Sequence, residues 1–159
     1  MTFQFYSVKS LFIYPVKIMN TPLPVTQLPV QVWAISATVQ CGFPSPAEDH
    51  TQKRLDLNEL LIHQPDATFF MRVRGPSMRD AGIDDGDYVV IDRSLEAKHG
   101  NVVLAVIDGE FTIKRLFRRA GRAKLQAANP TFTDIEFRDG QELIVWGVVT
   151  WTLKGLLPA

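Results

Sequence analysis

The chain has 159 residues, with 17 basic and 17 acidic side chains, so its formal net charge is zero. This length is enough for one domain with a modest core plus an arm. Hydrophobic residues make up 46% and charged residues 21%, which is ordinary for a soluble globular protein. The balanced charge argues against a protein whose main task is to coat nucleic acid, because such proteins are normally basic.

Cysteine, histidine and apolar runs limit the chemistry further. Cys41 is the only cysteine, so an internal disulfide is excluded, and the three histidines are scattered without metal-ligand spacing. No stretch approaches the roughly 20 apolar residues that a membrane helix needs. We therefore expect a cytoplasmic protein that holds no metal or other cofactor and has no membrane partner.

Residues 1–49 are predicted to form a flexible N-terminal arm. Residues 19–49 contain five prolines, which remove backbone donors and favour extended chain: Pro22, Pro24, Pro29, Pro44 and Pro46. We interpret residues 1–18 as an extension of this arm, with Met19 as an alternative start. Residues 50–159 are then expected to form the folded domain.

The folded domain is expected to begin with a short helix over residues 51–62. Leu57, Leu60 and Leu61 share one helical face there, and Pro65 follows. After the helix, short apolar runs alternate with turn signals, which predicts strands over residues 68–74, 87–92, 101–107, 110–117, 123–127 and 143–153. Asp108-Gly109 predicts a tight hairpin between two of them. The sequence therefore predicts a mainly β fold with mostly antiparallel strands.

Ser77 and Lys114 are the candidate catalytic residues. Ser77 lies in the turn-forming segment Gly75-Pro76-Ser77, and Lys114 lies within the apolar run 110–117. A serine hydroxyl becomes a good nucleophile when a base takes its proton, and a lysine is such a base only when neutral. Burial in an apolar strand lowers a lysine pKa, because desolvation penalises the ammonium. If both strand faces are covered, Lys114 is shielded from water and can serve as the base of a Ser-Lys hydrolase. The Ser77 N–H is then a candidate oxyanion donor.

Each of these residues also has an ordinary interpretation when taken alone. Lys114 could extend its ammonium to water, and Ser77 could be one of the many serines that occupy turns. A Ser-His-Asp triad is disfavoured because no Gly-x-Ser-x-Gly motif is present. The acidic run over residues 84–87 lacks the carboxylate spacing of a calcium loop.

A basic cluster surrounds Gly121. It consists of Arg115, Arg118, Arg119, Arg122 and Lys124. Such a cluster could contact an acidic partner or DNA, although a solvated hairpin end is the more common origin of such a pattern. The sequence leaves both interpretations open.

Five segments together resemble the UmuD family of the bacterial SOS response and, more broadly, the self-cleaving LexA-like Ser-Lys peptidases. They occur in family order: Val39-Gln40-Cys41-Gly42-Phe43-Pro44-Ser45-Pro46, Arg54-Leu55-Asp56-Leu57-Asn58, Gly75-Pro76-Ser77-Met78, Gly82-Ile83-Asp84-Asp85-Gly86-Asp87 and Asp108-Gly109-Glu110-Phe111-Thr112-Ile113-Lys114. The separation between Ser77 and Lys114 also matches this family. No single segment is specific, but their combination is.

The resemblance implies that Ser77 is the nucleophile and Lys114 the general base of a serine peptidase that cleaves its own chain between Cys41 and Gly42. It implies a β-rich peptidase domain that forms a homodimer. It also implies that a RecA filament on single-stranded DNA stimulates cleavage. The processed product would then join a UmuC-like subunit of an error-prone translesion DNA polymerase during SOS mutagenesis. The proline-rich arm is unsuited to a helix-turn-helix, so direct sequence-specific DNA binding is not expected.

The chain departs from the family pattern at Pro76, where UmuD proteins often carry an acidic residue, and over residues 1–38. Pro76 has no N–H and therefore cannot supply an oxyanion donor. Two other functions compete with self-cleavage. One is a non-cleaving binding module of the same fold that acts as a polymerase accessory. The other is a repressor-like or signal-peptidase-like enzyme that cleaves other proteins.

Overall fold

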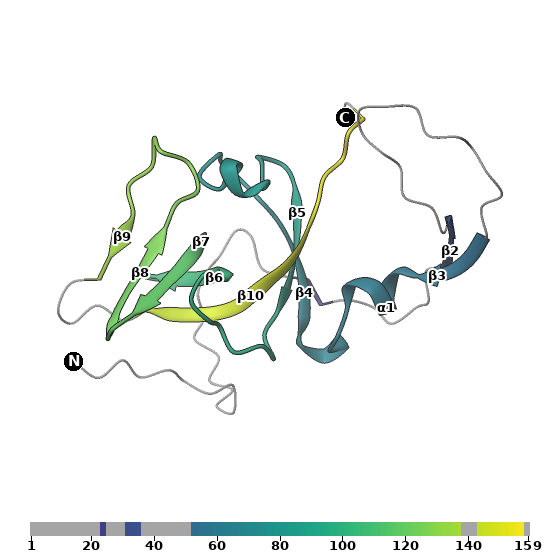
Figure 1. The fold of residues 1–159 in the computed structure, drawn as a ribbon, viewed down its shortest axis with the longest axis horizontal. Coiled ribbons are helices and arrows are strands. Elements are labelled where there is room, and N and C mark those ends of the chain that lie inside the picture. Colours follow the sequence, from purple (N-terminus) through teal and green to yellow (C-terminus); the bar gives the residue numbers. More distant parts are fainter. Residues whose placement is uncertain (1–22, 25–30, 36–51, 138–142, 158–159) are drawn as a thin grey trace.

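A computed structural model describes residues 23–24, 31–35, 52–137 and 143–157, which form an antiparallel β structure with little helix (Figure 1). The elements, in chain order, are β1 (Leu23–Pro24), β2 (Gln31–Ile35), β3 (Gln52–Asp56), α1 (Leu57–Leu61), the 3-10 helix η1 (Pro65–Ala67), β4 (Thr68–Arg72), the 3-10 helix η2 (Arg79–Ala81), β5 (Tyr88–Asp92), β6 (Val102–Ile107), β7 (Glu110–Arg119), β8 (Arg122–Gln126), β9 (Ile135–Glu136) and β10 (Ile144–Leu153). Within these residues no helix is long and apolar enough to cross a lipid bilayer.

Eight strands form one sheet in the order β1-β4-β5-β10-β6-β7-β8-β9, and every neighbouring pair is antiparallel. The long strand β10, yellow in Figure 1, joins the two halves of this sheet. Its first half pairs with β6, and its second half pairs with β5. The predicted mainly β, antiparallel fold is therefore confirmed.

The central strands are covered on both faces. Leu104 of β6 belongs to one buried cluster with Val89 and Ile91 of β5. Its neighbours Val103 and Ala105 point to the other face and belong to a second buried cluster. Because successive side chains of a strand alternate between faces, this pattern places β6 inside the protein. The strand β7 pairs along the full length of β6, and Lys114 and Leu116 in its middle are buried.

The tight hairpin predicted at Asp108-Gly109 is confirmed. These two residues connect β6 to β7 and have φ angles of 49° and 85°. Positive φ at both central residues is the signature of the type I′ turn, which matches the twist of the flanking strands. This turn fixes the register of β7 against β6, in which Lys114 lies opposite Val103.

The prediction of a helix over residues 51–62 is wrong for the first half of this segment. Residues 52–56 form β3, which pairs antiparallel with β2, and α1 begins only at Leu57. Asp56 sets the boundary, because its backbone is extended and its side chain caps the helix by accepting the Asn58 N–H at 2.8 Å. Leu60 is 39% exposed, so the expected apolar helix face is not buried. A helix this short has little stability of its own, and pairing with β2 decides the structure.

Two short strands lie within the predicted arm. Both strands are extended, as the prolines of the arm favour. The pairing of these strands with other segments was not predicted. β1 pairs with β4 at the edge of the large sheet, through Leu23 opposite Phe70 and Pro24 opposite Phe69. An edge position tolerates proline because one side of the strand needs no donor. The rest of the arm, including Met19, lies outside the described residues.

Replacing Gly147 of β10 with alanine is expected to destabilise the fold by about 1–3 kcal/mol. A Cβ there would lie 2.6 Å from the Cγ2 of the buried Ile91 and 3.2 Å from the Asp92 carbonyl oxygen. Urea unfolding measures the loss. Gly155→Ala is the matched control, because a Cβ at Gly155 meets nothing within 4 Å. Equal stability of the two variants would contradict this close packing.

Candidate active site

The turn that carries Ser77 leaves the sheet directly after β4. The Val73 N–H donates to the Asp87 carbonyl at 2.7 Å and continues the strand pairing for one more residue. Gly75 then takes a φ of +91°, which favours glycine, and its N–H donates to Asp85 Oδ1 at 2.6 Å. The glycine and the acidic turn 84–87 thus redirect the chain just before the serine.

The residue after the serine anchors the turn in the core. Met78 is 2% exposed and packs in the buried cluster with Met71, Val73 and Ile83. Its carbonyl accepts the Ile83 N–H at 3.3 Å, which closes the turn around η2. Ser77 therefore sits on a segment whose next side chain is fixed by packing.

A second segment, Ala128-Asn129, holds the turn from the other side. The Ala128 N–H donates to the Ser77 carbonyl at 2.9 Å, and Asn129 Nδ2 donates to the Pro76 carbonyl at 2.9 Å. Asn129 is 5% exposed, and its Oδ1 accepts hydrogen bonds from the N–H and the hydroxyl of Thr131. The carbonyls of both Pro76 and Ser77 are therefore fixed by hydrogen bonds.

Lys114 lies in the middle of β7 with 8% of its surface exposed. On its own face of the strand Leu116 is fully buried, and on the other face Ile113 packs against the core. The alternative of a lysine that extends its head group to water is therefore wrong. Desolvation by this burial lowers the pKa of Lys114 below its ordinary value.

The structure brings Ser77 and Lys114 together. Lys114 Nζ lies 2.8 Å from Ser77 Oγ, 3.1 Å from Thr112 Oγ1 and 3.0 Å from the Ile113 carbonyl oxygen. A neutral amine has two N–H donors and one lone pair, so it can donate to Thr112 and Ile113 and accept the Ser77 hydroxyl proton. Among the described residues no carboxylate forms a salt bridge with Lys114. The arrangement suits a neutral base beside a nucleophile.

Two backbone donors of the same turn are available for an oxyanion. Within the described part of the chain, the N–H groups of Ser77 and Met78 donate to no acceptor. The sequence pointed to the first of these donors and left the second open. The N–H of the residue after a nucleophile is a common second donor in other serine hydrolases, so the Met78 N–H is the second candidate donor.

The sequence also missed two supporting residues. Thr112 carried one signal, because it lies two positions before Lys114 and therefore on the same strand face. Asn129 precedes Pro130, a pair that indicates only a turn, and its distance along the chain from Pro76 gives no hint of their hydrogen bond. Cys41 and Gly42, the predicted cleavage site, lie outside the described residues.

The acidic turn 84–87 has a structural role. Lys154 Nζ lies 2.6 Å from Asp84 Oδ2 and 2.7 Å from Asp87 Oδ2, which ties the end of β10 to this turn. Burial raises the pKa of Asp87, but hydrogen bonds from Lys154 and the Asp84 N–H outweigh it and hold that pKa below its ordinary value. The described residues contain no group of side chains that could hold a metal ion.

Comparison with known proteins identifies the family. Residues 33–150 match the model of the Peptidase S24-like family. The chain is 46% identical to protein ImpA of Salmonella typhimurium over 113 residues, which are 70% of this chain and 75% of ImpA. It is 45% identical to protein MucA of Escherichia coli over 116 residues (72% and 79%) and 44% identical to protein SamA of Salmonella typhimurium over 126 residues (78% and 87%). The chain therefore belongs to the Peptidase S24-like family, and the resemblance to UmuD-like proteins is confirmed.

Replacing Asn129 with alanine is expected to lower the stability of the domain by about 1–3 kcal/mol, because the Pro76 carbonyl loses its donor. Thr131→Val is the control, since it removes the Thr131 hydroxyl from Asn129 but leaves the Asn129–Pro76 bond. Chemical denaturation of both variants measures the difference. If Asn129→Ala were no less stable than Thr131→Val, the proposed stabilisation of the serine turn by the Asn129–Pro76 hydrogen bond would be refuted.

Proposed function

We propose that this UmuD-like protein acts in SOS mutagenesis and cleaves its own chain between Cys41 and Gly42, with Ser77 as nucleophile and Lys114 as general base. The observation that carries the proposal is the 2.8 Å contact between Ser77 Oγ and the Nζ of a buried lysine. Lys114 pairs with no carboxylate among the described residues, and burial lowers its pKa, so it loses its proton more readily than an exposed lysine.

The proposed reaction begins when Lys114 Nζ takes the Ser77 hydroxyl proton and Oγ attacks the carbonyl carbon of Cys41. The N–H groups of Ser77 and Met78 stabilise the negative charge on the carbonyl oxygen. The bond between Cys41 and Gly42 then breaks, and the Lys114 ammonium gives its proton to the Gly42 nitrogen. Water, deprotonated by Lys114, hydrolyses the resulting ester and releases the Cys41 carboxylate, while the proton returns to Ser77 Oγ.

The surrounding hydrogen bonds support this role by holding the reacting atoms in place. Thr112 and the Ile113 carbonyl orient the amine, and Asn129 fixes the carbonyl just before the serine. Positioning of this kind lowers the barrier because the reacting groups need no further ordering.

Regulation and partners belong to the same proposal. The scissile bond is distant from Ser77 in sequence, so cleavage needs a docked arm whose population an activator can raise. We infer that a RecA filament on single-stranded DNA is this activator. We also infer that the protein is a homodimer, and that the chain from Gly42 onward joins a UmuC-like translesion polymerase subunit. The family resemblance supports these partners.

The test incubates the full chain at about pH 7 and about pH 10, and at neutral pH with activated RecA filament, followed by intact-mass measurement. We expect a fragment that begins at Gly42. Its rate should rise with pH until Lys114 has lost its proton and then level off, and this plateau should begin below the ordinary lysine pKa of about 10.4.

Ser77→Ala and Lys114→Ala should each abolish the fragment. The control is Lys98→Ala, which removes an exposed lysine from the same domain. A chain that stays intact under all three conditions would overturn self-cleavage and favour a non-cleaving binding module. Cleavage at another bond, or cleavage that survives either catalytic substitution, would overturn the assignment of these residues.

A further inference from the structure

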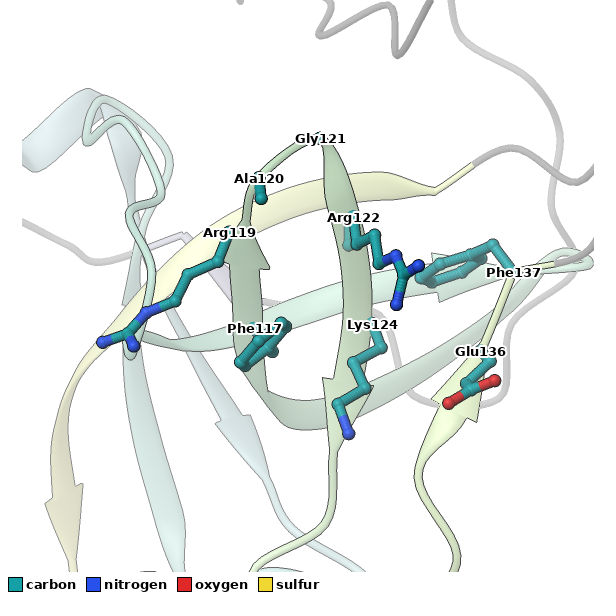
Figure 2. A pocket seen from close by; sticks show the side chains of 9 residues that line it. Phe117, Arg119, Ala120, Gly121, Arg122, Lys124, Glu136 and Phe137 are labelled. Atoms are coloured by element: carbon teal, nitrogen blue, oxygen red, sulfur yellow. The ribbon is translucent and has the colours of Figure 1, made fainter. Parts of the chain in front are cut away.

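A pocket with a volume of about 760 Å³ lies where β7, β8 and β9 meet, at the end of the β7–β8 hairpin (Figure 2). Its side chains combine charge with aromatic surface: Phe117, Arg119, Arg122, Lys124, Glu136 and Phe137. Neither Ser77 nor Lys114 lines it. The proposed peptidase chemistry therefore gives no reason for this pocket.

The pocket has an excess of positive charge that the described residues do not neutralise. Its lining contains three cations and one carboxylate, Glu136. Lys124 forms a salt bridge of 2.8 Å with Asp134. Within the described part of the chain, the exposed side chains of Arg119 and Arg122 form no salt bridge or hydrogen bond. Two guanidinium groups are therefore available for an anionic ligand.

Two features of the hairpin end lower the stability of the fold. Arg119 and Arg122 are directly opposite each other in the register of β7 and β8, and like charges at opposed positions destabilise a sheet. The turn between them places Ala120 at a φ of 49°, a conformation that disfavours alanine. Unfavourable features concentrated at one place are typical of functional sites.

The side chains define the shape of a ligand. In Figure 2, Arg122 extends toward Phe137, whereas Arg119 extends from the opposite side of the hairpin end. Phe117 and Lys124 occupy the space between the two arginines, with the Lys124 ammonium 5.4 Å from the centre of the Phe117 ring. A ligand that contacts both arginines as they lie in Figure 2 therefore spans Phe117 and Lys124 and carries negative groups at two separate points.

We propose that this pocket binds an extended acidic segment of a partner protein, in which carboxylates on either side of an apolar side chain pair with Arg119 and Arg122. Guanidinium groups bind carboxylates with two parallel hydrogen bonds, and the aromatic walls accept the apolar side chain. The proposal concerns a surface outside the Ser77 turn and does not depend on self-cleavage.

Nucleic acid fits the same surface less well. Glu136 would repel a continuous polyanion, and the chain as a whole has no net positive charge. The pocket therefore favours carboxylates presented by a protein.

The experiment measures fluorescence anisotropy of a short labelled peptide with acidic residues on both sides of Leu-Leu. The full chain carries Ser77→Ala, so that it keeps one length whether or not the proposed cleavage occurs. We expect binding that weakens with added salt and falls about tenfold or more in Arg119→Gln/Arg122→Gln, because charge-assisted hydrogen bonds are lost.

The matched control is Arg79→Gln/Lys98→Gln, which removes two exposed charges outside the pocket and should bind the peptide as before. A peptide with Asn and Gln in place of the acidic residues should not bind. Equal binding by wild type and the arginine variant, equal binding of the amide peptide, or no binding at all would overturn the proposal. Tighter binding of a labelled oligodeoxythymidine, lost in the arginine variant, would identify a nucleic-acid site instead and also overturn it.

Discussion

The contact between Ser77 Oγ and Lys114 Nζ depends on two conditions. The Lys114 amine must be shielded from water, and it must lie within hydrogen-bond distance of the Ser77 hydroxyl. The amine is shielded from water because β7 pairs with β6. Two buried clusters cover the two faces of β6. The short distance between Ser77 and Lys114 depends on the serine turn, which Met78 anchors in the core. The sheet and the turn are therefore both needed, and neither alone would produce a base next to a nucleophile.

This arrangement costs stability. The pKa of Lys114 is lower in the folded chain than in the unfolded chain, so the unfolded chain binds more protons at pH values between the two. Stability therefore rises as the pH increases through that interval, and at lower pH the lysine opposes folding. The paired strands around it supply the compensating burial of apolar surface. A destabilising lysine in the middle of a core strand is better explained by chemistry than by packing.

The sequence predicted the features that depend on local patterns. Alternation of apolar residues and the Asp108-Gly109 turn located β6 and β7. Motif spacing singled out Ser77 and Lys114, whose side chains are in contact in the structure. It failed where distant segments decide the outcome. Residues 52–56 became a strand because β2 lies beside them, and Asn129 holds Pro76 from far along the chain. The pocket at the β7–β8 hairpin end was visible only as a basic cluster, because its aromatic walls come from two separate segments.

The most direct test of the account is the pKa of Lys114 in the full chain carrying Ser77→Ala, followed by NMR of 13C-labelled lysine side chains during a pH titration. Lys114→Met in the same background identifies the signal by its absence. We predict one lysine that titrates clearly below the ordinary value of about 10.4, because burial, which does not require Ser77, lowers its pKa. A Lys114 signal that titrates at or above the ordinary value would contradict the account, since no neutral base would then face the serine near neutral pH.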